Sequence, residues 1–322
     1  METTIYCGLA CEECSRDDYD RCDDCHYLAV ELHDVHNGDS VCSDCVGSYH
    51  ECGDCSHLIS YDEDYCSDCR YGRHDDRIQY YSYKPDPVFH GDGDLHLGLE
   101  LEVKTRPSTL RRCVDIALEH LGSLGYLKED GSIGNNGFEM VTHPMSYPWA
   151  IMHFPWAMLP ELDAGGAYID ADVGIHVHVS RSGFATPAHV YRWMKFVYRN
   201  EFQATQLARR TSTEWANFDS DARAEIVNYA KGDREGFGRY QAINVYPEHT
   251  YEVRIFASSL HPQQVQAALA FVAASVEYTR ELTSADIARR RGWEWTAFVT
   301  WVRSHTAYSP LLAEMEALSC AS

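Results

Sequence analysis

The chain has 322 residues and a mass of 36.6 kDa, enough for one large folded domain and a small one. Its formal charge of −22 disfavours binding to a nucleic-acid backbone, which needs a basic surface. No apolar run approaches the roughly 20 residues that cross a bilayer, and METTIYCGLACEEC lacks the basic and apolar blocks of a signal peptide. We therefore expect a cytoplasmic protein with reduced thiols that binds neither membranes nor nucleic acid.

Cysteines dominate the first part of the chain. Eleven of the 13 fall between Cys7 and Cys69, and ten of these form five Cys-x-x-Cys pairs. Two sulfurs at this spacing can approach one tetrahedral Zn²⁺. We expect a small zinc-ribbon or knuckle module whose folding energy comes from the metal. The pairs are Cys11/Cys14, Cys22/Cys25, Cys42/Cys45, Cys52/Cys55 and Cys66/Cys69.

An internal repeat predicts how these pairs share metal ions. CDDCHYL…SVCSDC and CGDCSHL…DYCSDC match each other, which assigns one structural zinc to each copy. Spacing alone also allows a rival pairing, Cys11/Cys14 with Cys22/Cys25 and Cys42/Cys45 with Cys52/Cys55. The ligands predicted from the repeat are Cys22, Cys25, Cys42 and Cys45 for one site and Cys52, Cys55, Cys66 and Cys69 for the other.

Two further readings of the cysteines stay open. Cys7, Cys11 and Cys14 could form a third zinc site with a nearby histidine. A disulfide framework is the alternative to zinc, and it would require secretion. The segment is also acidic, because residues 1–87 hold 21 of the 49 acidic residues but only 6 of the 27 basic ones. We expect such a module to bind a protein partner rather than DNA.

Composition divides the chain into three parts. We place the zinc module at residues 1–75, a linker at 76–95 and a larger domain at 96–322. The linker contains YYSYKPDPVFHGDGD, whose prolines and glycines interrupt any regular element. Beyond it, strands alternate with amphipathic helices. One expected helix begins at Ser108. Two longer helices are expected from Pro187 to about Arg210 and from about Pro262 to Leu282, and two more at Trp293–Ser304 and Leu311–Leu318.

Four stretches of the larger domain place ionisable side chains within an apolar frame. In a strand, residues i and i+2 lie on one face about 6.5 Å apart, so the intervening apolar residues form the opposite, buried face. Side by side, such strands would give a sheet with one apolar face and one face of carboxylates, imidazoles and a guanidinium. The residues are Glu100 and Glu102 in GLELEV, Glu139 in GFEMV, His176 and His178 in GIHVHVS, and Glu252 and Arg254 in YEVRIF.

This polar face has the chemistry of a metal–phosphate reaction surface. Mg²⁺ prefers oxygen ligands and shares them with substrate phosphates, and paired carboxylates could hold two ions. An imidazole and an arginine would offset the charge of a transferring phosphoryl group. The alternative is that these residues are only the solvated faces of strands, but several such pairs together favour a site. The chain has no GxxxxGK[ST], GxSxG or HExxH motif.

The order of the motifs resembles the amidoligase family, carboxylate–amine ligases with a glutamine-synthetase-like fold. The resemblance implies an α+β fold with a curved, largely antiparallel sheet and helices on its outer side. It also implies an ATP-dependent ligase, in which ATP phosphorylates a carboxylate and an amine attacks the acyl phosphate to form an amide. The motifs, over about residues 96–262, are GLELEV, KEDGSI, FEMVTHP, GIHVHVS, RYQAINV and YEVRIFASSLHP.

The resemblance also implies metal ligands. By similarity, Glu100, His176 and Glu252 would hold the Mg²⁺ or Mn²⁺ ion that bridges the nucleotide phosphates. Glu102 and Glu139 would hold a second ion nearer the acceptor carboxylate. The expected cofactors are therefore ATP, Mg²⁺ or Mn²⁺, and the structural Zn²⁺ ions.

Other residues receive roles in the same way. Arg254 would stabilise the moving phosphoryl group, and His178 would lie beside the nucleotide. Arg239 is a further candidate for contacting an anion. Asp130, in the DGS turn, and Asn244 match family positions and are assigned to substrate or amine positioning.

One departure from the family concerns the second metal. Glutamine synthetase has an additional glutamate beside the one that Glu139 resembles, and Val141 cannot replace it. Two other functions stay open: a metal-dependent hydrolase that uses the His/Glu cluster, and a non-catalytic zinc adaptor with an inactive ligase-like domain. The carboxylate and amine substrates, which range from free amino acids to peptides, proteins and cell-wall fragments, are not identified by the sequence.

Overall fold

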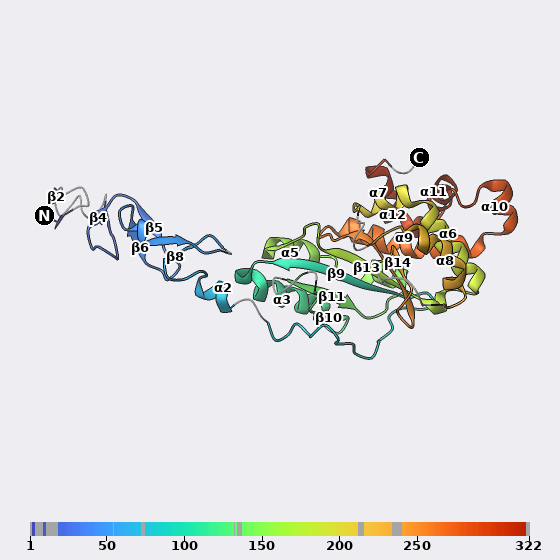
Figure 1. The fold of residues 1–322 in the computed structure, drawn as a ribbon, viewed down its shortest axis with the longest axis horizontal. Coiled ribbons are helices and arrows are strands. Elements are labelled where there is room, and N and C mark those ends of the chain that lie inside the picture. The colour runs from blue at the N-terminus through green and yellow to red at the C-terminus, as the bar shows by residue number, and fades with distance from the viewer. Residues whose placement is uncertain are drawn as a thin grey trace. The chain divides into compact units, whose positions relative to one another are not determined.

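The chain divides into two compact units, Met1–Asp75 with Arg106–Arg111, and Asp76–Thr105 with Arg112–Ser322. Arg239 and the cysteines of the proposed third zinc site, Cys7, Cys11 and Cys14, lie outside the described residues. The structure is a computed structural model that describes residues 2–3, 9–10, 19–53, 55–71, 75–131, 133, 137–211, 216–233 and 240–319 (Figure 1).

The first unit is built from short antiparallel strand pairs. Its few buried apolar residues include Ala29, Val41 and Ile59, and they pack beside cysteines rather than in a core of their own. The 3₁₀ turn Val46–Ser48 and helix α2, Ser67–Tyr71, complete the unit. The strand pairs are β1 (Glu2–Thr3) with β2 (Leu9–Ala10), β3 (Asp20–Arg21) with β4 (Leu28–Ala29), β5 (Leu32–Asp34) with β6 (Ser40–Cys42), and β7 (Tyr49–Glu51) with β8 (Leu58–Ser60).

The second unit is a mixed α+β structure around one large antiparallel sheet. The sheet has seven strands and stays open, with the order β10-β11-β9-β13-β15-β14, and β12 pairs with β9. Its central strand β9 therefore has β11 on one side and β13 on the other. The strands are β9 (Leu97–Thr105), β10 (Gly125–Lys128), β11 (Gly137–Thr142), β12 (Ala167–Tyr168), β13 (Gly174–Ser180), β14 (Ile243–Asn244) and β15 (Thr250–Ala257).

Strand β9 alternates as its sequence predicts. Leu99, Leu101 and Val103 are at most 1 % exposed and form the apolar face of the strand. Helix α9, Pro262–Glu281, packs against β9 and β13 and is buried along most of its length. Helices α6, α11 and α12 pack around α9 (Figure 1). One face of the sheet is thereby buried, which leaves the charged side chains on the other face.

The expected helices are present apart from one break, and the described residues of the second unit add four helices that the sequence analysis does not predict, α4, α5, α8 and α10. The helices are α3 (Pro107–Leu121), α4 (Tyr147–His153), α5 (Met158–Gly165), α6 (Pro187–Arg199), α7 (Glu201–Ala208), α8 (Ser220–Ala230), α9, α10 (Ser284–Arg290), α11 (Trp295–Arg303) and α12 (Ser309–Ala317), with 3₁₀ turns at Arg181–Gly183 and Thr306–Tyr308. Within these described helices, none has the length and apolar character needed to cross a bilayer.

The break divides the helix expected from Pro187 to about Arg210 into α6 and α7. Asn200 lies between them, and its side-chain amide donates to Phe196 O at 2.8 Å and to Trp293 O at 3.0 Å. An asparagine amide that bonds to nearby carbonyls competes with the helical ladder. The helix is therefore interrupted at Asn200. The direction of α7, and of the residues that follow it, depends on this interruption.

The segment expected as a linker is fixed along the sheet. Gln79 N–H donates to Leu127 O, and Glu129 N–H donates to Gln79 O, both at 2.8 Å. Further along, Ser146 N–H donates to His90 O at 2.8 Å. Residues 76–95 thus form no helix or regular strand, yet their backbone is tied to the edge strand β10 and to the chain after β11.

We expect His189 to make stability depend on pH. Its ring is 1 % exposed, Nε2 donates to Val276 O at 2.8 Å, and Nδ1 accepts from Ala185 N–H. Burial lowers the pKa of His189 to about 4. The unfolded chain binds a proton near pH 6.5 and the folded chain does not, so stability present above pH 6.5 is lost as pH falls toward about 4, at up to about 1.4 kcal/mol per pH unit.

Urea unfolding between pH 7 and pH 5 measures this loss. The His189→Gln variant should be less stable at pH 7, because the buried hydrogen bonds are altered, but its unfolding free energy should fall less steeply with pH. Equal slopes for variant and wild type would contradict the assignment.

Candidate active site

Strand register brings the predicted charged residues together. Strands β11, β9, β13 and β15 are neighbours in the sheet although they are far apart in the sequence. Facing residues on neighbouring antiparallel strands have side chains about 4.5–5.5 Å apart at Cβ. The facing pairs are Glu102/Glu139, Glu100/His176 and His178/Glu252.

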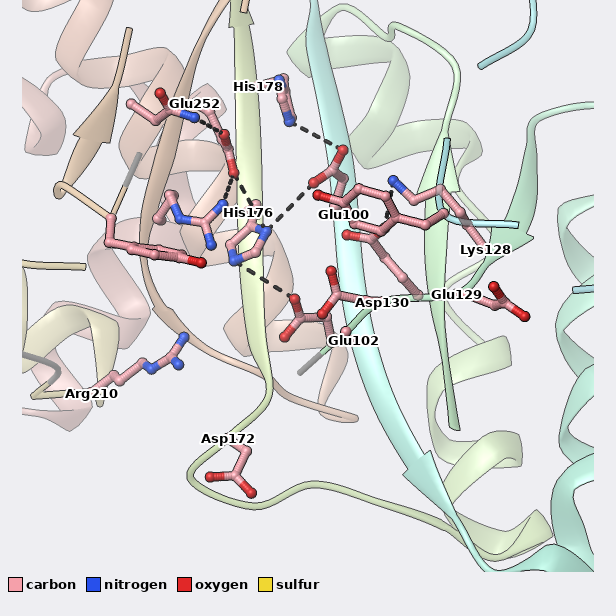
Figure 2. Close-up of a pocket in the computed structure, with 16 residues that line it drawn as sticks. Glu100, Glu102, Lys128, Glu129, Asp130, Asp172, His176, His178, Arg210 and Glu252 are labelled. Atoms are coloured by element: carbon pink, nitrogen blue, oxygen red, sulfur yellow. Dashed lines mark hydrogen bonds and ion pairs between the residues drawn. The ribbon is translucent and has the colours of Figure 1, made fainter. Parts of the chain in front are cut away.

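These side chains line one cavity of about 850 Å³ on the polar face of the sheet (Figure 2). Of the ten residues predicted outside the cysteine segment, nine lie in its wall, and the tenth, Arg239, lies outside the described residues. The nine are Glu100, Glu102, Asp130, Glu139, His176, His178, Asn244, Glu252 and Arg254.

The first possible cation site centres on Glu100. His176 Nδ1 is 3.4 Å from Glu100 Oε2 and 3.5 Å from Glu252 Oε1, while His178 Nε2 is 3.2 Å from Glu100 Oε1. Ligand atoms of Glu100, His178 and Glu252 lie within 4.8 Å of one another, as do those of Glu100, Glu139 and His176. His178, predicted to lie beside the nucleotide, thus belongs to a ligand group itself.

The second possible cation site consists of carboxylates alone. Glu102, Asp130 and Glu139 have oxygens within 4.8 Å of one another. Gly174 N–H donates to Glu102 Oε2 at 2.6 Å and fixes that carboxylate. The sequence analysis assigns Asp130 to substrate positioning, but in the structure its carboxylate belongs to this ligand group. Val141, two residues after Glu139, faces Glu100 on β9 and supplies no ligand.

The crowding of these groups shifts the pKa values of their carboxyl groups. Burial opposes ionisation of Glu100, but His178 and His176 outweigh it and hold the Glu100 pKa well below its usual range. Burial and the charge of Glu100 raise the pKa of Glu139 well above its usual range, and burial raises the pKa of Glu102. A cation bound between such carboxylates would favour their ionised forms.

Cationic and amide side chains hold the carboxylates in place. Lys128 Nζ is 2.8 Å from Glu139 Oε2, and the two residues face each other on β10 and β11. Arg254 is ion-paired with Glu252 Oε1, and Asn244 Nδ2 donates to Glu252 Oε2 at 2.6 Å. Figure 2 shows His176 of β13 linked to Glu100 and Glu102 of β9 and to Glu252 of β15, so the side chains point toward one another from three strands. Glu139 is therefore held by one cationic side chain, and Glu252 by a cationic side chain and an amide.

Sequence reasoning missed part of the cavity wall. Lys128 carried a signal, because it lies two residues before Asp130 in KEDGSI at the end of a strand. Tyr81 and Arg210 carried none, since they lie in irregular segments that only the tertiary structure brings to the site. The missed residues are Tyr81, Lys128, Glu129, Gly131, Asp172, Arg210 and Tyr240.

The described cysteines of the first unit form two clusters in which four sulfurs lie within 4.8 Å of one another, and each cluster could hold a zinc ion. The grouping follows the repeat and not the rival pairing. In each copy the first cysteine accepts a backbone N–H: Cys42 N–H to Cys22 Sγ at 3.3 Å, and Cys66 N–H to Cys52 Sγ at 3.4 Å. The clusters are Cys22, Cys25, Cys42 and Cys45, and Cys52, Cys55, Cys66 and Cys69.

Backbone conformation repeats as well. His26 and Ser56, which follow Cys25 and Cys55, both have a φ of 61°. This left-handed conformation is uncommon for residues other than glycine, so its recurrence at equivalent positions marks the same knuckle turn. None of the eight cysteines of the clusters is in a disulfide, so each can lose its proton and bind zinc as a thiolate.

Comparison with known proteins assigns the chain to no family. No protein-family model matches the chain, and no curated protein is significantly similar to it. The resemblance to the amidoligases therefore rests on the six motifs and their order.

We expect the cysteine clusters to bind zinc independently of the cavity. In Cys42→Ser, the zinc content measured by mass spectrometry on zinc-loaded protein should fall by about one ion per chain, because three thiolates hold zinc less tightly than four. Cys113→Ser is the matched control, since Cys113 is buried in α3 outside both clusters. Unchanged zinc content in Cys42→Ser would exclude the first cluster as a zinc site.

Proposed function

We propose that this protein is an ATP-dependent carboxylate–amine ligase with a glutamine-synthetase-like catalytic domain. The observation that carries the proposal is the gathering of two possible cation sites, which comprise three ligand groups, and Arg254 in one cavity. Such a cavity suits a substrate with several negative charges, because cations and a guanidinium together neutralise a polyphosphate. The six ordered motifs support the same reaction class.

The donor sets fit divalent metal ions of the expected kind. Glu102, Asp130 and Glu139 offer only carboxylate oxygens, which suit Mg²⁺. The group at Glu100 adds imidazoles, and such a mixed set also suits Mn²⁺. Ions held there would neutralise the phosphates and polarise the reacting oxygens. Each ligand group brings three side chains within 4.8 Å of one another, which would leave positions on an octahedral ion for substrate.

The proposed reaction has two bond exchanges. First, an oxygen of the acid substrate attacks the γ-phosphorus of ATP, and the bond from that phosphorus to the bridging oxygen breaks to release ADP. The amine nitrogen then attacks the acyl carbon, the carbon–oxygen bond to phosphate breaks, and the amine loses its proton. The products are an amide, ADP and phosphate.

Arg254 is the residue we assign to the transferring phosphoryl group. Its side chain is 15 % exposed, and its ion pair with Glu252 fixes the guanidinium at the first cation site. A preorganised donor of this kind stabilises charge that develops in the transition state without reorganising. Asn244 acts through Glu252, because its amide bond holds that carboxylate in position.

We propose a recruiting role for the zinc module, residues 1–75. Each predicted zinc site has four cysteines, so no coordination position is open for chemistry. The acidic excess of the segment suits a basic protein partner or a macromolecular substrate.

Glu100→Gln and Arg254→Ala test the ligase. With ATP·Mg²⁺ and a pool of candidate acids and amines, release of ADP and phosphate should fall at least about 100-fold in each variant, because each removes a charge from the phosphoryl-transfer site. Glu161→Gln is the control, since Glu161 is half-exposed and bonds to His120 outside the cavity wall. Full turnover in the variants would refute the assignments, and cleavage of an amide by the protein in the absence of ATP would favour the hydrolase.

A further inference from the structure

The two cysteine clusters of the first unit lie on segments that pair with each other. The cluster that contains Cys42 belongs to the first copy of the repeat, and the cluster that contains Cys66 belongs to the second copy. Val35 of the first copy forms a parallel bridge with Leu58 of the second, and His36 N–H donates to Leu58 O at 2.9 Å. The backbone therefore joins the two copies through hydrogen bonds.

Apolar packing also crosses between the copies. Strands β7 and β8 form the hairpin whose turn carries Cys52 and Cys55, the first cysteine pair of the second cluster. Tyr49 and Leu58 of this hairpin nevertheless pack against the buried residues around the first cluster. Ile59, also from the hairpin, is buried beside the second cluster. One hairpin thus packs against both clusters.

Side-chain hydrogen bonds reach into the metal-binding turns themselves. Tyr49 Oη donates to Asp24 Oδ1 at 3.0 Å, and Asp24 lies inside the first cysteine pair of the first cluster. In the opposite direction, His36 Nε2 shares a hydrogen bond of 3.2 Å with Ser67 Oγ, and Ser67 lies inside the second cysteine pair of the second cluster. One ligand turn of each cluster is therefore held by a residue from the segment that carries the other cluster.

Each copy is too small to fold on apolar burial alone. Domains below about 40 residues usually need metals or disulfides, and each copy is shorter than that. Cysteines make up two of the five buried residues around the first cluster and three of the four around the second. Metal binding is therefore coupled to the folding of each copy. Because each copy also supports the ligand turns of the other, an ion bound at one cluster would favour the conformation that the other cluster needs.

We propose that the two clusters bind zinc cooperatively, so that residues 20–71 fold as one metal-dependent unit. The interface formed by Val35, His36, Tyr49 and Leu58 transmits the effect from one cluster to the other. The inference rests on the two zinc sites and is independent of the ligase reaction. It gives the proposed recruiting role a steep dependence on zinc, since a partner surface on this unit is complete only when both ions are bound.

Titration of the full chain with Co²⁺, the spectroscopic probe for zinc, tests the coupling. Thiolate-to-cobalt charge-transfer absorption reports the cysteine clusters and not the oxygen and nitrogen ligands of the cavity. Cys11→Ser and Cys14→Ser are present in every sample, so that only the two described clusters are counted. Tenfold coupling between equal sites gives a binding curve with a Hill coefficient of about 1.5.

Leu58→Ala should lower this coefficient toward about 1, because it removes packing between the copies and no ligand. Val30→Ala is the matched control and should keep the wild-type value, since Val30 is exposed and belongs to neither buried group. A coefficient that Leu58→Ala leaves unchanged would overturn the interface as the cause of the coupling.

Chains with one intact cluster separate coupling from a general loss of folding. Cys42→Ser/Cys45→Ser leaves only the second cluster, and Cys66→Ser/Cys69→Ser leaves only the first. Each variant should still reach full charge-transfer absorption for one ion, but its half-filling should on average require at least about three times the cobalt that the chain with both clusters requires. Equal midpoints, or a Hill coefficient of about 1 with both clusters intact, would overturn the cooperativity.

Discussion

Mutual repulsion among carboxylates is the constraint on which the candidate site of the larger unit depends. Glu100, Glu102, Asp130, Glu139 and Glu252 line one cavity, and three of them are at most 5 % exposed. Buried like charges disfavour one another, as the opposite pKa shifts of Glu100 and Glu139 show. The imidazoles, Lys128 and Arg254 compensate only part of this charge. Bound cations would therefore stabilise the ionised carboxylates of the cluster, so the stability of the site would depend on the ions that it binds.

The same strands that carry the carboxylates also supply the core. Leu99, Leu101 and Val103 face α9, while Glu100 and Glu102 between them face the cavity. A slip of one residue in register would move every side chain to the other face. The apolar face of β9 thus fixes the register that aligns the acidic face, so packing and site geometry are set by one interaction.

Sequence patterns predicted the features that depend on residues close together in the chain. Period-two alternation identified the charged faces of GLELEV, GIHVHVS and YEVRIF, and the cysteine repeat identified which pairs share a cluster. The place of Asp130 in a ligand group could not be predicted this way, because it depends on how the turn after β10 meets β9. The break at Asn200 depends on Trp293, which is 93 residues away in sequence. Arg210 follows from that break, so no pattern in its own neighbourhood could reveal it.

The chain holds two kinds of candidate metal centre, and their ligands separate their roles. Four thiolates around one point leave a tetrahedral ion no open position, so the cysteine clusters are suited to holding structure. The carboxylate and imidazole groups reach an ion with three side chains, and an ion with octahedral preference then keeps positions for water or substrate oxygens. Adjacent to those open positions lie Arg254 at one ligand group and Arg210 beside the other. A polyanionic ligand that reaches both groups at once would therefore meet two guanidinium ions in addition to any bound cations, and these contacts would orient it along the sheet.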